Sequence, residues 1–141
     1  MSGREVHDLL KLRFDVFVLE QKSLYPEIDG LDPEALHGLR REGSEIVGAC
    51  RMTGLEDHGP VNLGRIAIRA DRRGGGAGRT LIRAALAEAA TRAPGRRLEI
   101  EAQAHLQPYY EGFGFARTPR AEFLDGGIPH VEMSLILPSA A

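Results

Sequence analysis

The sequence has little of what several classes of protein require. A single cysteine among the 141 residues, Cys50, excludes an internal disulfide framework, and its apolar surroundings favour a buried structural role. No segment approaches the roughly 18 apolar residues that a transmembrane helix needs. Residues 1–20 carry charges throughout and no cleavage-site pattern, so they do not resemble a signal peptide. We therefore expect a cytoplasmic location.

An excess of one charge sign is also missing. The formal net charge is −2, which gives no sign of a nucleic acid or a membrane surface as a partner. Lysine is scarce, since only Lys11 and Lys22 are present, so nearly all basic groups are guanidinium groups. Arginine suits fixed, bidentate contacts with phosphate, although a genome-wide composition bias would give the same count. The length predicts one domain, residues 1–141.

Hydrophobic periodicity predicts a mixed α/β sheet. Apolar residues at helical spacing predict a helix over roughly residues 4–20, with Val6, Leu9, Leu10, Phe14 and Phe17 on its buried side. Strands are expected at 36–42 and 45–54 as a hairpin, then at 61–69, 97–102 and 131–137. Helices are expected before Pro94 and at 104–112. Helices and strands in this order indicate a mixed sheet flanked by helices.

The expected strand at 61–69 changes phase. Val61 and Leu63 place apolar side chains on odd positions, whereas Ile66 and Ile68 place them on even positions. A strand cannot change phase without an extra residue, so we expect a β-bulge near Gly64 and Arg65. Bulges often lie beside active sites.

A glycine-rich segment, RRGGGAG at 72–78, joins this strand to the following helix. Backbone N–H groups at a helix N-terminus attract anions, and Arg72, Arg73, Arg79 and Arg83 surround the point. The lysine of a P-loop and the third glycine of a dinucleotide-binding fingerprint are both absent. The segment does match the pattern [QR]-x-x-G-x-[GA] of GNAT acetyltransferases, through Arg73, Gly76 and Gly78. A flexible loop without a ligand is the alternative interpretation.

Five further segments resemble the ElaA-type proteins of the GNAT superfamily. They are LRFDVFVLEQ (12–21), YPEIDGLD (25–32), LGRIAI (63–68), AQAHLQPYYEGFGF (102–115) and GGIPHVEM (126–133), in the family's order and across nearly the whole chain. The resemblance implies the GNAT fold, with a V-shaped split between the two central parallel strands. It also implies a strand before the first helix. We expect that strand to be missing here, or the chain to start too late to include it. The VFV-x-EQ segment also resembles acyl-homoserine-lactone synthases, but the IPH and AQAHLQ segments do not.

The resemblance implies acetyl-CoA as cofactor and places its binding residues on this chain. The backbone of Ile66, Ala67 and Ile68 would pair with the pantetheine, and Gln103 would contact the cofactor. The pyrophosphate would lie against the glycine-rich loop, which consists of Arg73, Gly74, Gly75, Gly76, Ala77, Gly78 and Arg79. No histidine spacing suggests a metal site.

Tyr110 matches the tyrosine that protonates the leaving thiolate in many relatives, whereas Tyr109 is expected in the core. The general base is left open among Glu101, His105, His130 and Glu20, or a water chain, with Glu101 as the catalytic carboxylate that we choose. On the acceptor side, the resemblance and the expectation of a cationic amine indicate Glu20, Glu27 and Asp29. His130 is a further candidate there.

The sequence thus predicts an N-acetyltransferase that moves an acetyl group from acetyl-CoA to a primary amine of a small molecule or peptide, by direct attack through a tetrahedral intermediate. A non-catalytic acyl-CoA-binding module is the alternative, and a longer acyl group is not excluded. Homodimers are common in the superfamily, and the sequence leaves the oligomeric state open.

Overall fold

The first helix is capped at its N-terminus. In the computed structural model, which describes residues 1–21 and 29–139, α1 spans Gly3–Arg13. The Ser2 hydroxyl accepts a hydrogen bond from the N–H of Glu5, and the Glu5 carboxylate accepts one from the N–H of Ser2. This reciprocal capping box satisfies two donors that a helix N-terminus otherwise leaves unpaired.

The predicted helix over residues 4–20 is α-helical only in its first part. After Arg13 the chain continues as a π-helix, η1, over Phe14–Glu20, and the N–H of Gln21 bonds to the carbonyl of Val16. A π turn contains more residues than an α turn, so the apolar stripe changes phase. The predicted stripe is therefore wrong at Phe14, which is exposed, while Val16 is buried. It is also wrong in the α-helical part, where Val6 is exposed and Leu12 is buried.

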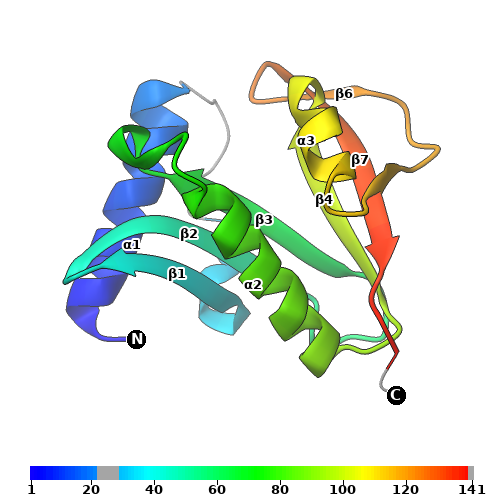
Figure 1. Ribbon diagram of the computed structural model, residues 1–141, viewed down its shortest axis with the longest axis horizontal. Coiled ribbons are helices and arrows are strands. Elements are labelled where there is room, and N and C mark those ends of the chain that lie inside the picture. The colour runs from blue at the N-terminus through cyan, green and yellow to red at the C-terminus, as the bar shows by residue number, and fades with distance from the viewer. Residues whose placement is uncertain (22–28, 140–141) are drawn as a thin grey trace.

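The sheet is mixed, as predicted (Figure 1). Its strands lie in the order β1-β2-β3-β4-β7-β5, with β6 paired to β7, and only β3 and β4 run parallel. The strands are β1 (Leu36–Glu42), β2 (Glu45–Thr53), β3 (Val61–Ile68), β4 (Arg97–Gln103), β5 (Ala116–Arg117), β6 (Phe123–Asp125) and β7 (Ile128–Ile136). In the described residues no strand precedes α1.

The helices cover both faces of the first three strands. Helix α1 and η1 lie behind the sheet in Figure 1, and α2 (Ala77–Arg92) lies in front of it. Leu9, Leu12 and Phe17 pack against Ala49 and Ala67 on the α1 face. A larger core lies on the α2 face and also takes in α3 (Gln107–Glu111) through Tyr110. Short 3-10 turns complete the fold: η2 (Asp32–Glu34), η3 (Ala70–Arg72) and η4 (Ala104–Leu106).

The sequence did not predict two short strands, and the last strand is longer than expected. Strand β7 begins at Ile128 rather than Val131, and β6 pairs with it through a turn at Gly126 and Gly127. Strands β5 and β6 have two and three residues. Segments that short show no periodicity, so only their pairing with β7 defines them.

None of the helices in the described part of the chain has the length and apolar character needed to span a membrane.

Candidate active site

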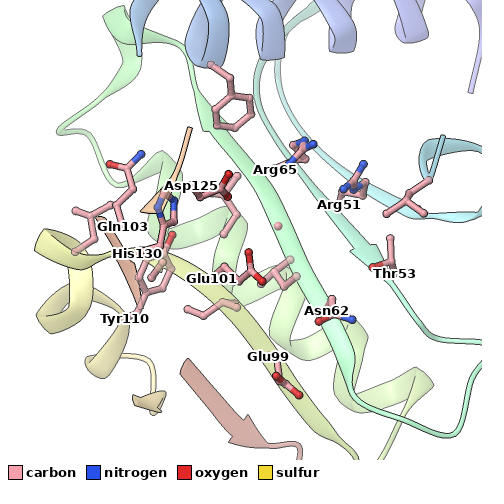
Figure 2. Close-up of a pocket in the computed structure, with 18 of the residues that line it drawn as sticks. Arg51, Thr53, Asn62, Arg65, Glu99, Glu101, Gln103, Tyr110, Asp125 and His130 are labelled. Carbon is pink, nitrogen blue, oxygen red and sulfur yellow. The ribbon is translucent and has the colours of Figure 1, made fainter. Parts of the chain in front are cut away.

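A cleft opens where β3 and β4 separate. The two strands pair only at Val61 with Leu98 and at Asn62 with Glu99, after which they diverge. The predicted V-shaped split is therefore confirmed. The cleft has a volume of about 430 Å³ and is lined by side chains from β2, β3, β4, α3, β6 and β7, as Figure 2 shows.

The predicted β-bulge is confirmed and lies at this split. Ala49 of β2 pairs with Ala67, and Arg51 pairs with Gly64, so β3 has one residue more than its partner between the two pairs. Arg65 takes up the extra length in the left-handed region, at φ 49°. Because of the bulge, Val61 and Leu63 share the α2-side core with Ile66 and Ile68 despite their different phase.

The predicted pantetheine segment forms the free edge of β3. Ala67 and Ile68 pair on one side with Ala49 and Gly48 of β2, while β4 has moved away on the other side. Ile66 lines the cleft directly. An extended chain laid along this edge would find strand-like backbone partners. The backbone role of Ile66, Ala67 and Ile68 stays a prediction.

The glycine-rich loop presents the N-terminus of α2. Gly76 is its N-cap residue at φ 84° and Gly74 has φ 82°, conformations that favour glycine. Gly76 makes no side-chain cap, so the first N–H groups of α2 lack the acceptor that a capping side chain would supply. Arg79 and Arg83 are exposed and make no ion pair with any described residue. The loop therefore has the donors and charge that an anion requires.

The side chain of Arg73 turns away from this helix end. Its Nε and Nη2 donate to the carbonyl oxygen of Ile68 at 3.0 and 2.9 Å, and its Nη1 contacts the Glu20 carboxylate at 2.5 Å. Arg73 thus ties the loop to the end of β3 and to η1. Only the backbone of Arg73, rather than its side chain, is left for the predicted pyrophosphate contact in this arrangement.

Tyr110 reaches the cleft from α3. It is 8% exposed and lies among the rings of Tyr109, Phe113 and Phe115. Burial raises the pKa of its hydroxyl to about 12, with a smaller contribution from Tyr109. The phenol therefore keeps its proton at neutral pH. The expectation that Tyr109 belongs to the core is wrong: its ring packs edge-on against Tyr110 and Phe113, but it is 36% exposed.

Polar side chains of β4 also line the cleft. Glu101 contacts Arg120 at 3.3 Å, and Gln103 donates from Nε2 to the Gln21 side-chain oxygen at 3.3 Å. Gln103 lies opposite His130 in the pairing with β7, and both line the cleft with Tyr110. The structure therefore brings together Tyr110, Glu101, Gln103 and His130.

The acids expected to hold the acceptor have partners within the chain. Glu20 is paired with Arg73, as described above. Asp29 accepts two hydrogen bonds of 2.9 Å from Arg51 and one of 3.3 Å from Arg65. The hydrogen bonds from Arg51 lower the pKa of Asp29 to about 2, against the opposing effect of desolvation. A cationic acceptor would have to compete with these arginines. Glu27 lies outside the described residues.

Sequence reasoning missed an ion-pair network behind the cleft. Arg13 is fully buried and donates to Asp32 at 2.9 Å, and Arg51 contacts Asp32 at 3.2 Å as well as Asp29. We define the network as Arg13, Asp29, Asp32, Arg51 and Arg65. The available signal was a charged residue, Arg51, within the apolar run of β2.

Two other expectations concern single side chains. Cys50 is buried, as predicted, and desolvation raises the pKa of its thiol to about 11, which makes it a poor nucleophile. His105 is exposed and lies outside the cleft lining. Within residues 1–21 and 29–139, no group of three or more His, Cys, Asp or Glu side chains could hold a metal ion.

One family model matches most of the chain. The model of the acetyltransferase (GNAT) domain matches residues 5–137. Among curated proteins, UPF0039 protein Rv2851c of Mycobacterium tuberculosis is 41% identical, over 94% of this chain and 85% of the relative.

Solved structures agree with the sequence matches. Escherichia coli ElaA is 33% identical with a TM-score of 0.87, covering 95% of this chain and 91% of that one. An acyl-CoA N-acyltransferase from Pseudomonas aeruginosa is 32% identical with a TM-score of 0.86, covering 95% and 92%. An aminoglycoside 6'-N-acetyltransferase complexed with coenzyme A is 14% identical and shares the fold, with a TM-score of 0.73 over 99% and 94% of the two chains.

Proposed function

This chain belongs to the GNAT acetyltransferase family, and from that premise we propose that it transfers an acetyl group from acetyl-CoA to a primary amine of a small molecule or peptide. The observation that carries the proposal is the cleft between β3 and β4, which has a free strand edge, an uncapped helix N-terminus and Tyr110 around it. A similar fold holds coenzyme A in the aminoglycoside acetyltransferase.

The residues around α2 fit the phosphates of such a cofactor. A Cβ atom built on Gly74 or Gly76 meets nothing within 4 Å, so the loop is open on its outer side. The first N–H groups of α2 and the side chain of Arg79 would hold the pyrophosphate. Acetyl-CoA would supply the activated acetyl thioester, and the free edge at Ile66–Ile68 would hold its extended arm.

Three carboxylates favour an amine as the acceptor. Glu99, Glu101 and Asp125 line the wall of the cleft formed by β4 and β6. Arg97 pairs with Glu99 and Arg120 with Glu101, so the three acids leave an excess of negative charge on that wall, which attracts an ammonium group. The sequence favours Glu101 among four candidates for the general base. Tyr110 protonates the leaving thiolate after the amine has attacked, because its phenol holds a proton at neutral pH.

Gly75 of the loop allows cofactor binding to be changed without disturbing the fold. Gly75 has no positive φ, and a Cβ there would meet only the Arg72 carbonyl at 4.0 Å. Gly75→Asp therefore adds a carboxylate beside the expected phosphates without backbone strain, and Gly75→Ala is the matched neutral control. In calorimetric titration with acetyl-CoA, we expect affinity to fall about 100-fold in Gly75→Asp, because roughly 3 kcal/mol of charge-assisted contact is lost.

A thiol-release assay with a panel of primary amines completes the test. The panel contains 1,4-diaminobutane, spermidine, phenethylamine, glucosamine and short peptides with free N-termini. Binding together with thiol release supports the transferase. Binding without release from any amine supports the non-catalytic acyl-CoA-binding module. A folded wild-type protein that does not bind acetyl-CoA contradicts both functions.

A further inference from the structure

We propose that His130 is the general base, whose Nε2 takes a proton from the acceptor amine. The inference rests on the proposed acetyl transfer and assigns a step that the sequence left open among four side chains. It is carried by the hydrogen bond, the ring packing and the position of this one imidazole.

A backbone carbonyl fixes the tautomer of His130. Its Nδ1 lies 2.7 Å from the carbonyl oxygen of Ile128. A carbonyl oxygen can only accept, so the proton of this bond belongs to Nδ1. In the neutral ring Nε2 then carries the lone pair and acts as the acceptor. A base for an amine requires this tautomer, since the other would present an N–H group to the substrate.

The β6–β7 hairpin holds the ring in place. Phe123 pairs with His130 across the hairpin, and the two rings stack with centroids 5.9 Å apart and planes inclined by 27°. The Arg120 guanidinium lies 3.8 Å above the centroid of Phe123. The imidazole is thus supported from the hairpin side while its residue lines the cleft (Figure 2).

The position of His130 matches the expected chemistry. His130 lies directly opposite Gln103, the predicted cofactor contact, in the pairing of β4 with β7. Tyr110, the proposed acid, lines the same cleft from α3, and Figure 2 labels all three residues together on one side of it. A base and an acid on one wall can serve an amine and a thiolate at the same carbonyl group.

The other candidate bases are engaged or misplaced. Glu20 contacts Arg73 at 2.5 Å, so its carboxylate is engaged in an ion pair. Glu101 contacts Arg120 at 3.3 Å, and its side chain is 53% exposed. His105 does not line the cleft. His130 lines the cleft and makes no ion pair with any described residue, whereas Glu101 lines it in an ion pair with Arg120.

Charged groups of both signs line the cleft that holds His130. Glu101 from β4 and Asp125 from β6 line the same cleft, and Tyr110 is the titratable group from α3. Arg51 of β2 and Arg65 of β3 line the same cleft. Arg120 contacts both Glu101 and Glu132 of β7.

The proton balance of the transfer is complete with these two residues. The acceptor enters as an ammonium ion and gives one proton to Nε2, which passes it to solvent. The free amine attacks the thioester carbonyl and forms the C–N bond. The C–S bond then breaks as Tyr110 protonates the sulfur, and the phenolate takes the second amine proton. The products are the amide, free thiol and one released proton.

A matched pair of variants tests the assignment kinetically. In His130→Asn the amide nitrogen occupies roughly the place of Nδ1, so the bond to Ile128 can persist while Nε2 is removed. We expect kcat/KM in the thiol-release assay, with the best amine of the panel, to fall about 100-fold. Acetyl-CoA affinity by calorimetry should stay unchanged, and imidazole added to His130→Ala should restore part of kcat. His105→Asn is the control and should match wild type.

The outcomes distinguish this inference from the proposed function. An active wild-type enzyme whose kcat/KM survives His130→Asn, or falls only in Glu101→Gln, overturns the base and leaves the transfer intact. A wild-type protein without thiol release overturns the transfer and the base together. Nitrogen-15 spectra of labelled histidine give a readout apart from activity. A His130 signal with the proton on Nε2 contradicts the assignment directly.

Discussion

At the scale of single residues, Tyr110 differs from its neighbour Tyr109 mainly in burial. Tyr110 is 8% exposed and lines the cleft, whereas Tyr109 is 36% exposed and lies outside the lining. Desolvation disfavours the phenolate of Tyr110 and raises its pKa to about 12. A phenol with that pKa keeps its proton at neutral pH and can donate it to the leaving thiolate.

Tyr110→Phe removes only the hydroxyl group. We expect kcat for thiol release to fall about 100-fold, because the thiolate then leaves without a proton donor. Acetyl-CoA affinity by calorimetry should remain within a factor of three or so, since the ring packing persists. Tyr109→Phe is the matched control and should retain wild-type kcat. Equal rates for both variants would show that Tyr110 only packs.

Short motifs predicted identities at this scale but not side-chain partners. Arg73 matched the pattern of the glycine-rich loop, yet its guanidinium bonds to Ile68 and Glu20. Asp29 matched the family segment, yet Arg51 and Arg65 hold it. The partners come from other elements of the sheet, and no local spacing encodes distances across a fold.

At the scale of elements, the ion-pair network connects four parts of the chain. Arg13 belongs to α1, Asp32 to η2, Arg51 to β2 and Arg65 to the bulge of β3. Asp29 and Asp32 accept from these arginines. The network therefore holds the segment before β1 against the bulged strand beside the cleft.

Asp29→Asn should lower the free energy of unfolding. It should also weaken the dependence of that free energy on pH in the acid range. The folded pKa of Asp29, about 2, lies below the ordinary 3.8, so the unfolded chain binds its proton more readily. The stability is therefore complete above about pH 4 and is lost as pH falls towards 2. We expect a loss of about 2 kcal/mol at pH 7 by urea unfolding.

Urea unfolding of wild type and variant at low pH supplies the control. Below about pH 3 the difference between wild type and Asp29→Asn should shrink, because the wild-type carboxyl group is then becoming protonated. Asp57→Asn, at an exposed loop position without an ion pair to any described residue, should behave like wild type. A constant difference at every pH would show that Asp29 acts through packing or geometry and not through its charge.

At the scale of the whole molecule, cofactor binding should couple to folding. The cleft draws on β3, β4 and α3, and the phosphates are expected at the start of α2. A ligand that binds only the folded state at 100 times its Kd stabilises it by about 2.7 kcal/mol. We expect acetyl-CoA at that concentration to raise the melting temperature by about 8 °C. Gly75→Asp should melt near wild type without the ligand and show no such rise.

Sequence periodicity predicted the large-scale plan well and its finer parts poorly. The phase change between Leu63 and Ile66 located the bulge, and alternating residues located the long strands. The π-helix at Phe14–Glu20 and the short strands β5 and β6 were missed. Tertiary packing decides such elements, and it overrides weak local preference.

The bulge is a mismatch in the number of residues between two paired strands, comparable to a dislocation in a crystal lattice. Between its flanking pairs, β3 has one residue more than β2, and Arg65 absorbs the excess. Replacing a side chain leaves such a fault in place, because only an insertion or deletion changes the count. Glu101 and His130 can therefore be exchanged for other side chains while the opening persists. Relatives that keep the count can adopt new acceptors without rebuilding the sheet.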